Sequence, residues 1–255
     1  MVGIVGLYVP TTVLAYVSLT WHPVASIVPA MSVDPVSIRK LVFWPAIVTL
    51  AVTLLRVTGE LLHWSPTLFN PAAGGGGALV GISWLPPIFG ILFAIQLARA
   101  GHGPQSGGRA IGMAVLGVAA TAAVIAGASA LGVIGQGQFS MMALVLFTTA
   151  IAVGAAVAWW GWPALGQTLL AYAFAARVPV ALLMLVAMLG NWGTHYDVAP
   201  PSFPEMGVFS KWLMIGALPQ LTTWIAFTVL SGALFGSIAG AVASRRTSTA
   251  SPMRA

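Results

Sequence analysis

The sequence predicts an all-α integral membrane protein, built as an antiparallel bundle of six transmembrane helices. Hydrophobic residues make up 59% of the 255 residues and charged residues only 5%, whereas soluble domains contain about 25% charged residues. Apolar runs of about 20 residues, the length that crosses a bilayer, recur along the chain. Helices are the expected form of these runs because they satisfy their own backbone hydrogen bonds in lipid.

Six such runs define the expected helices, and short polar segments separate them. Each run crosses the bilayer once, so consecutive helices must alternate in direction. The expected spans are 41–60, 79–98, 110–134, 140–160, 163–190 and 209–242. We therefore expect 31–242 to form one transmembrane domain, followed by a short basic tail at 243–255.

Residues 1–30 allow two interpretations. The segment 1–21 is apolar and long enough to span, which would add a seventh helix with its amino terminus outside. Alternatively, translation starts at Met31, because MSVDPVSIRKLVFWP contains a polar opening, a basic pair and then interfacial aromatic residues.

The basic residues gather at one end of the expected helices. Cytoplasmic segments of membrane proteins carry an excess of Lys and Arg, so this end is expected to face the cytoplasm. It contains Arg39, Lys40, Arg99, Arg109, Arg245, Arg246 and Arg254. Both termini of the six-span core are therefore expected to be cytoplasmic, and the charge pattern favours a bacterial inner membrane.

The first span carries a row of polar side chains on one helix face. Thr49, Thr53, Arg56, Glu60 and His63 recur at intervals of three or four residues, the spacing that aligns side chains along a helix. An ionisable residue inside a bilayer costs about 2.5–3.5 kcal/mol unless it faces protein or water. We therefore expect this polar stripe to face the interior of the bundle.

The fifth span carries a second buried cation, Arg177, two residues before Pro179. By helical rise, Arg56 and Arg177 both lie roughly 21–24 Å from the inner boundary. We expect Arg56, Glu60 and Arg177 to form a cluster near the outer third of the bundle. One carboxylate between two guanidinium groups leaves a net positive charge that suits an anion. A structural role, in which the pair fixes helix register, stays open.

The segment NWGTHYDVAPPSFPEMG, at 191–207, is expected to form an outer loop after the fifth span. Asp197 or Glu205 would fold over the positive cluster, and His195 with either carboxylate is a candidate acid and base pair. No metal site is predicted, because these isolated residues lack a metal-ligand spacing. The predicted binding residues are Arg56, Glu60, His63, Arg177, His195 and Asp197.

The sixth span is too long for one upright helix, and Pro219 is expected to divide it. The part before Pro219 would lie at the membrane interface or re-enter. After it, Gly232, Gly236 and Gly240 share one helix face, a spacing that lets another backbone approach closely. That face would pack within the bundle or form a homodimer.

Several kinds of chemistry have no support in the sequence. The chain contains no cysteine, which excludes disulfides and thiolate nucleophiles. The glycine run Gly74–Gly77 lacks the Lys-Ser/Thr of a P-loop and is expected to form a flexible outer turn. GxSxG and HExxH motifs are also absent. We predict no cofactor and no nucleic-acid partner, since the basic residues lie at span ends beside the lipid bilayer.

Three functions remain open. We favour a non-enzymatic bundle that handles a solute or lipid, as a transporter or permease, with the charged cluster lining its site. A permease would need an ATPase partner or an ion gradient, because the chain has no nucleotide-binding motif. The alternatives are an assembly protein that uses the glycine face to bind itself or another membrane subunit, and an enzyme that acts through His195, Asp197 and Glu205.

The layout of six spans with both ends inside resembles the permease subunit of ABC-type exporters. GQTLLAYAFAARVP, at 166–179, is similar to the penultimate helices of bacterial Yip-domain-type proteins. Both resemblances lie in layout and hydropathy, so they imply a multi-helix membrane fold and assign no functional residue.

Overall fold

The computed structural model of this protein describes residues 35–75, 77–134 and 140–249. Six of the helical stretches in these ranges are long and apolar enough to cross a membrane. This confirms the predicted six-helix membrane bundle and makes the chain a multi-pass membrane protein. The interpretations of residues 1–30 lie outside the described residues, as does the end of the basic tail, 250–255.

The observed spans lie within several residues of the predicted ones. The first five are α1 (Pro35–Leu61), α2 (Leu85–Arg99), α3 (Gly107–Ala130), α4 (Met141–Gly161) and α5 (Pro163–Gly190). The sixth consists of α6 (Val208–Lys211), η4 (Trp212–Ala217), α7 (Leu218–Leu221) and α8 (Thr223–Thr249). Two short 3₁₀ turns, η2 (Ala73–Gly75) and η3 (Ile82–Trp84), lie between α1 and α2.

Helix ends follow local sequence signals. The side chains of Ser106 and Ser140 cap α3 and α4 by accepting hydrogen bonds from backbone N–H groups of the first turn. Pro163 begins α5, where its missing N–H has no cost. Asn191, with φ of 47°, ends α5 in the left-handed conformation that Asn tolerates.

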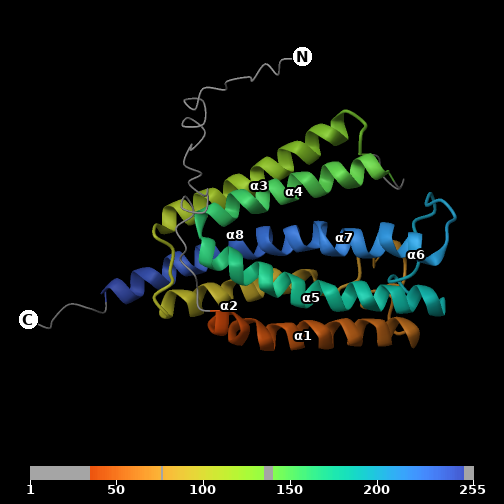
Figure 1. The fold of residues 1–255 in the computed structure, drawn as a ribbon, viewed down its shortest axis with the longest axis horizontal. Coiled ribbons are helices and arrows are strands. Elements are labelled where there is room, and N and C mark those ends of the chain that lie inside the picture. Colours follow the sequence, from red (N-terminus) through yellow and green to blue (C-terminus); the bar gives the residue numbers. More distant parts are fainter. Residues whose placement is uncertain (1–34, 76, 135–139, 250–255) are drawn as a thin grey trace, which may run out of the picture. The chain divides into compact units, whose positions relative to one another are not determined.

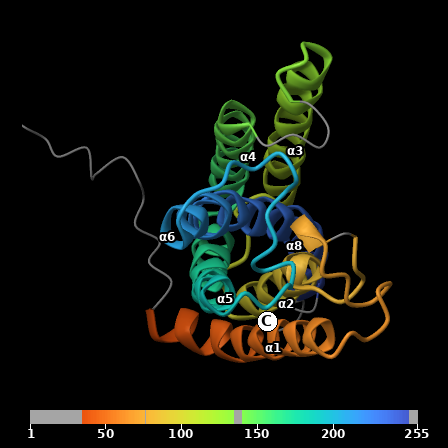
Figure 2. The ribbon, with the colours of Figure 1, turned by 90° about the vertical axis from the view of Figure 1, so that its right-hand side faces the viewer.

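Consecutive spans alternate in direction, and α8 packs against α2, α3, α4 and α5 (Figure 1). The α1 helix packs chiefly on α5, and α3 pairs with α4. At the end that carries the α1–α2 segment and the 191–207 loop, α3 and α4 lie apart from the other helices (Figure 2). The positive-inside pattern assigns this end to the outer face, and we call it the outer end.

Glycines allow the central helices to approach closely. A Cβ built on Gly90 of α2 would lie 2.3 Å from the carbonyl oxygen of Gly232 of α8. The structure places Gly236 against Gly90 and Leu165, and Gly240 against Trp162. The expected glycine face is therefore buried inside the chain, so it is not available to a second copy.

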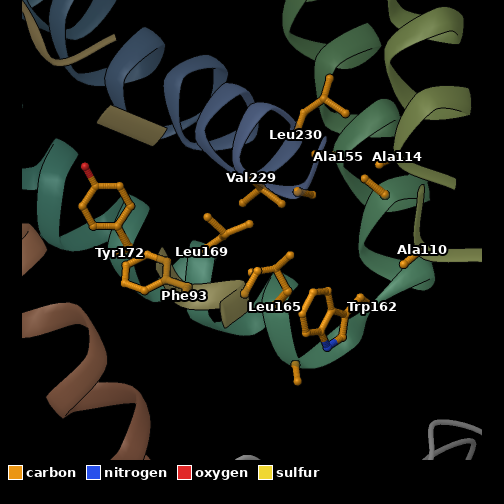
Figure 3. Close-up of a cluster of buried hydrophobic side chains, with 14 of the residues drawn as sticks. Phe93, Ala110, Ala114, Ala155, Trp162, Leu165, Leu169, Tyr172, Val229 and Leu230 are labelled. Atoms are coloured by element: carbon orange, nitrogen blue, oxygen red, sulfur yellow. The ribbon is translucent and has the colours of Figure 1, made fainter. Parts of the chain in front are cut away.

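A hydrophobic core fills the inner half of the bundle (Figure 3). It contains Phe93 of α2, Leu165 and Leu169 of α5, and Val229 and Leu230 of α8, all buried. Trp162, at the junction of α4 and α5, closes this core and donates a 3.0 Å hydrogen bond to the carbonyl oxygen of His102. Apolar side chains thus fill the inner half, and the polar residues of the predicted site lie towards the outer half.

The sixth span is irregular on both sides of Pro219. Residues Trp212–Ala217 form a π-helix, which accommodates the missing N–H of Pro219 by widening the preceding turn. The backbone leaves helical geometry at Thr222, with φ of −123° and ψ of −74°. The part before Pro219 continues into α8 as one irregular helical stretch (Figure 1), and its place relative to the membrane interface stays a prediction.

Gly90→Ala should destabilise the bundle by about 1–3 kcal/mol, since its new methyl group would overlap the backbone of Gly232. The matched control is Gly112→Ala in α3, where nothing lies within 4 Å of the added Cβ. The measurement is the apparent Tm of each variant in detergent. An unchanged Tm for Gly90→Ala would contradict the close α2–α8 contact.

Candidate functional site

The polar stripe of α1 faces α5 and the 191–207 loop. The hydroxyl of Thr49 lies 2.7 Å from the hydroxyl of Tyr172 on α5. The hydroxyl of Tyr196 lies 3.4 Å from the carbonyl oxygen of Thr53, to which it donates. Thr49, Thr53, Arg56 and Glu60 are all buried. The stripe thus lies at the contact between α1 and the elements that carry the other predicted residues.

His63 does not lie on the polar stripe. The α1 helix ends at Leu61, and His63 follows it with a positive φ of 51° and an exposed side chain. The three-or-four-residue spacing carries a side chain onto the stripe only while the helix continues. The expected place of His63 on the polar stripe was therefore wrong, and its role in binding stays a prediction.

Arg56 holds the segment between α1 and α2 against the bundle. Its Nε donates a 2.8 Å hydrogen bond to Oε1 of Glu60, the expected i, i+4 pair. Its Nη1 donates to the carbonyl oxygen of Val80 at 2.8 Å, and its Nη2 donates to that of Gly75 at 3.1 Å. Gly75 has a φ of +85°, and a Cβ there would lie 2.9 Å from Nη2. Gly75 is therefore part of the site, a role that the composition of the glycine run alone did not indicate.

Glu60 joins α1 to the 191–207 loop. Its Oε1 lies 2.6 Å from Nδ1 of His195, and its Oε2 accepts a 2.9 Å hydrogen bond from the backbone N–H of His195. The Glu60 side chain has no exposed surface, so these partners replace water around the carboxylate. The charge on Arg56 is balanced by the same group.

In the 191–207 loop, the pKa values of His195 and Tyr196 are shifted so that each side chain favours its uncharged form. Burial lowers the pKa of His195 below its usual 6.5, although the hydrogen bond to Glu60 opposes that change. Burial also raises the pKa of Tyr196. His195 is therefore neutral at neutral pH, and its ring lies against that of Tyr196 with 3.9 Å between ring centroids.

Asp197 shapes its own loop and does not reach across to the arginines. Its Oδ1 accepts hydrogen bonds of 2.7 Å from both the backbone N–H and the hydroxyl of Thr194, and its Oδ2 accepts one from Gly193 N–H at 2.9 Å. Glu205 is exposed. The expected fold of these carboxylates over the positive cluster was wrong, because nearby N–H groups satisfy Asp197 first.

Arg177 is buried in α5 with 3% of its surface exposed. Its guanidinium carbon lies 4.8 Å from the ring centroid of Trp224, and Nη1 makes only a long 3.5 Å hydrogen bond to the side chain of Gln220. Its Nε is buried with no hydrogen-bond partner. Among the described residues, Arg177 forms no ion pair, so it does not share Glu60 with Arg56 as expected.

The two arginines lie at different distances from the ends of their helices. Arg56 is five residues before Leu61, the end of α1, and Arg177 is thirteen residues before Gly190, the end of α5. At 1.5 Å per residue these distances are about 8 Å and about 20 Å. Arg177 is thus near the middle of its span, where an ionised side chain is most costly.

A cavity of about 320 Å³ lies between these groups at the outer end of the bundle, and we call it the outer cavity. It is bounded by α1, the α1–α2 segment, the start of α4, α5, the 191–207 loop and the irregular sixth span. Its lining includes Arg56, Gly75, Arg177, His195, Gln220 and Trp224. Among the residues that the structure describes, no Asp or Glu side chain lines it. Since Glu60 balances Arg56, Arg177 gives the outer cavity a net positive charge.

The sequence indicated four of the polar residues of this site and missed its apolar side. Arg56, Glu60, Arg177 and His195 all come together at or beside the outer cavity. Trp224 was not singled out, although it lies four residues after Gln220 and lines the same cavity. Within the described residues no three His, Asp or Glu side chains gather as a metal-binding group.

Comparison with known proteins gives no match. No family model fits the sequence, and no curated protein or solved structure is significantly similar to it. Function therefore has to be argued from the site itself.

Glu60→Gln should lower the free energy of unfolding by about 1.5–3 kcal/mol, because it removes the charged acceptor of Arg56 and His195. Glu205→Gln, at an exposed position in the same loop region, should change it by less than about 0.5 kcal/mol. Thermal unfolding of both variants in detergent tests this. Equal Tm values for the two variants would show that the Glu60 contacts do not hold the loop.

The stability of the protein should fall as the pH decreases below about 6.5. The unfolded chain then binds a proton at His195 while the folded protein resists it, so protons favour unfolding. Glu60, Arg56 and Asp197 are the charged groups around this ring. The measurement compares the pH dependence of Tm in wild type and His195→Gln, and the variant should lose less stability between pH 7.5 and 5.5. Identical pH profiles would contradict the lowered pKa.

Proposed function

We propose that this multi-pass membrane protein binds a small organic anion in the outer cavity, as part of handling a solute or lipid at the outer side of the membrane. The observation that carries the proposal is Arg177, a buried cation near mid-span that lines the cavity and has no ion-pair partner among the described residues. A lone buried charge costs several kcal/mol. A bound anion would remove this cost and would use the unpartnered Nε.

The size and composition of the cavity support a small organic ligand. Small-molecule sites commonly have volumes of about 300–1,000 Å³, mostly apolar walls and a few polar groups that fix orientation. The outer cavity has about 320 Å³, and Val180 and Met184 of α5 face it together with Ile215 of η4. Arg177 and Gln220 would then orient the charged group of the ligand.

A transporter or permease needs a route beyond the binding site. The inner half below Tyr172 is filled by the core around Phe93 and Leu169, so transport would require the helices to move apart there. The proposal therefore concerns binding first, with transport through an ATPase partner or an ion gradient as its extension. Assembly through the glycine face is less favoured, because α2, α5 and Trp162 cover those glycines.

An enzyme is the second candidate, and the contact between Glu60 and His195 favours it. When a carboxylate holds Nδ1 of a histidine, Nε2 of that histidine can serve as a general base. His195 is held by Glu60 in this way and lines the cavity together with the hydroxyl-bearing Ser83. Loss of a hydrolytic activity in His195→Ala, with anion selectivity of the cavity unchanged, would favour this candidate over simple binding.

Charge-selective labelling tests the anion site directly, since the chain has no cysteine of its own. Met214→Cys places a thiol in the cavity lining. Two reaction rates of this thiol are measured, one with a sulfonate-bearing methanethiosulfonate and one with its trimethylammonium analogue, and each is divided by the rate of a free thiol in solution. The normalised rate with the sulfonate should be about tenfold higher, because positive clefts concentrate anions. Adding Arg177→Gln should abolish this preference.

Two controls accompany the labelling experiment. Leu213→Cys, an exposed neighbour outside the lining, should show the same reagent ratio with and without Arg177→Gln. Arg99→Gln, at the opposite end of the bundle, removes the same charge and should leave the Met214→Cys preference intact. A preference that survives Arg177→Gln would overturn the proposed anion site.

A further inference from the structure

The walls of the outer cavity identify the kind of anion that would fit it. The charged end is formed by Arg177 with Gln220. The remaining lining is mainly aliphatic and aromatic, with Val52 of α1, Val180 and Met184 of α5, and Trp224 of α8. A fully hydrated inorganic anion would leave these apolar walls in contact with water. A ligand with both a charged head and an apolar part would cover them.

One wall of the cavity lies at the lipid-facing side of the bundle. Leu144, near the start of α4, lines the cavity. One turn further into α4, Thr148 hydrogen-bonds Thr223 at the start of α8, which joins the two helices there. Figures 1 and 2 show that α3 and α4 lie apart from the other helices beyond this point, towards the outer end.

The edges of this wall carry exposed apolar side chains. Val145 beside Leu144 is 54% exposed, and Leu218 and Leu221 of α7, on either side of Gln220, are exposed as well. In a transmembrane segment such side chains face lipid. The cavity is therefore bounded on one side by residues that touch the outer leaflet, with Leu144 between the cavity and the bilayer.

We propose that the ligand is an amphipathic monoanion, with a carboxylate or phosphodiester head at Arg177 and an apolar tail that passes between Leu144 and α7 into the outer leaflet. This inference rests on the proposed function and specifies its ligand class. One guanidinium without an ion-pair partner in the described part of the chain matches one negative charge on the head. A cavity of about 320 Å³ holds the head and the first part of a tail, and the rest remains in the bilayer.

Protection of Met214→Cys from the sulfonate reagent measures ligand binding in the purified full chain. The tailed probes are oleate and dioleoyl phosphatidylglycerol, which distinguish a carboxylate from a phosphodiester head. Butyrate and glycerol 3-phosphate carry similar heads without a long tail, and dioleoyl phosphatidylcholine has tails without net charge. At least one tailed monoanion should protect at a concentration about tenfold or more below its short counterpart, because each buried CH₂ contributes about 0.8 kcal/mol.

Variants locate the head and the tail separately. Arg177→Gln should remove the protection by every anion. Leu144→Trp should weaken protection by the tailed anions by about tenfold, whereas Val145→Trp, the lipid-facing neighbour, should leave it unchanged. If Arg177→Gln does not fold, the comparison of the two tryptophan variants still tests the tail path, and Arg177→Lys, which keeps the charge, should retain protection.

The possible failures are distinguishable. Equal protection by butyrate and oleate, and by glycerol 3-phosphate and phosphatidylglycerol, would leave the anion site standing and overturn the tailed ligand. Equal effects of Leu144→Trp and Val145→Trp would overturn the path past α4. Protection by no anion, or protection that phosphatidylcholine matches, would overturn the anion site and the amphipathic ligand together.

Discussion

The outer half of this protein depends on one carboxylate. Glu60 accepts from Nε of Arg56, which in turn holds the α1–α2 segment through the carbonyl oxygens of Val80 and Gly75. The same carboxylate accepts from the backbone and lies against the ring of His195 in the 191–207 loop. Two loops and one helix are thus fixed around a single buried charge. Because Glu60 balances Arg56, the positive charge of Arg177 is left for the cavity that these loops cover.

The two halves of the bundle are stabilised in different ways. The inner half relies on close backbone approach, with Gly90 against Gly232 and Gly117 against Gly154, and on the buried core around Phe93 and Leu169. Packing of this kind is the main source of helix association in lipid, where the hydrophobic effect between helices is absent. The outer half instead uses hydrogen bonds between loops and helix ends. A rigid inner half and a polar outer half can hold a binding cavity open while the bilayer surrounds it.

Hydropathy predicted the six spans because lipid imposes one demand on every stretch of chain that crosses it. Helical spacing predicted that Thr49, Thr53, Arg56 and Glu60 share a face, which depends only on residues of one helix. The partners of these groups could not be predicted in the same way. Glu60 contacts His195, 135 residues later, whereas Asp197 accepts a hydrogen bond from Thr194, three residues before it. Which partner each carboxylate takes depends on loop geometry that periodicity does not describe.

Missing local signals explain the other errors. His63 was assigned to the stripe by continuing the helix past Leu61, although the helix ends there. Glycines such as Gly90 and Gly154 have no partner in their own sequence neighbourhood, and only the fold brings each to the helix that it contacts. The position of Arg177 in the sequence correctly indicated a residue of the site. A cation in the middle of an apolar run is costly wherever its partners lie.

The irregular sixth span explains how Arg177 is held although no carboxylate of the described ranges pairs with it. The π-helical turn at Trp212–Ala217 and the break at Thr222 lie on either side of Pro219 and Gln220, and Trp224 follows within one turn of α8. A regular helix would need the N–H that Pro219 lacks, so the backbone departs from α-helical geometry here. Gln220 and Trp224 then contact the guanidinium as a weak acceptor and an aromatic face. Both interactions are weaker than an ion pair, so they position Arg177 while its charge stays available to a bound anion.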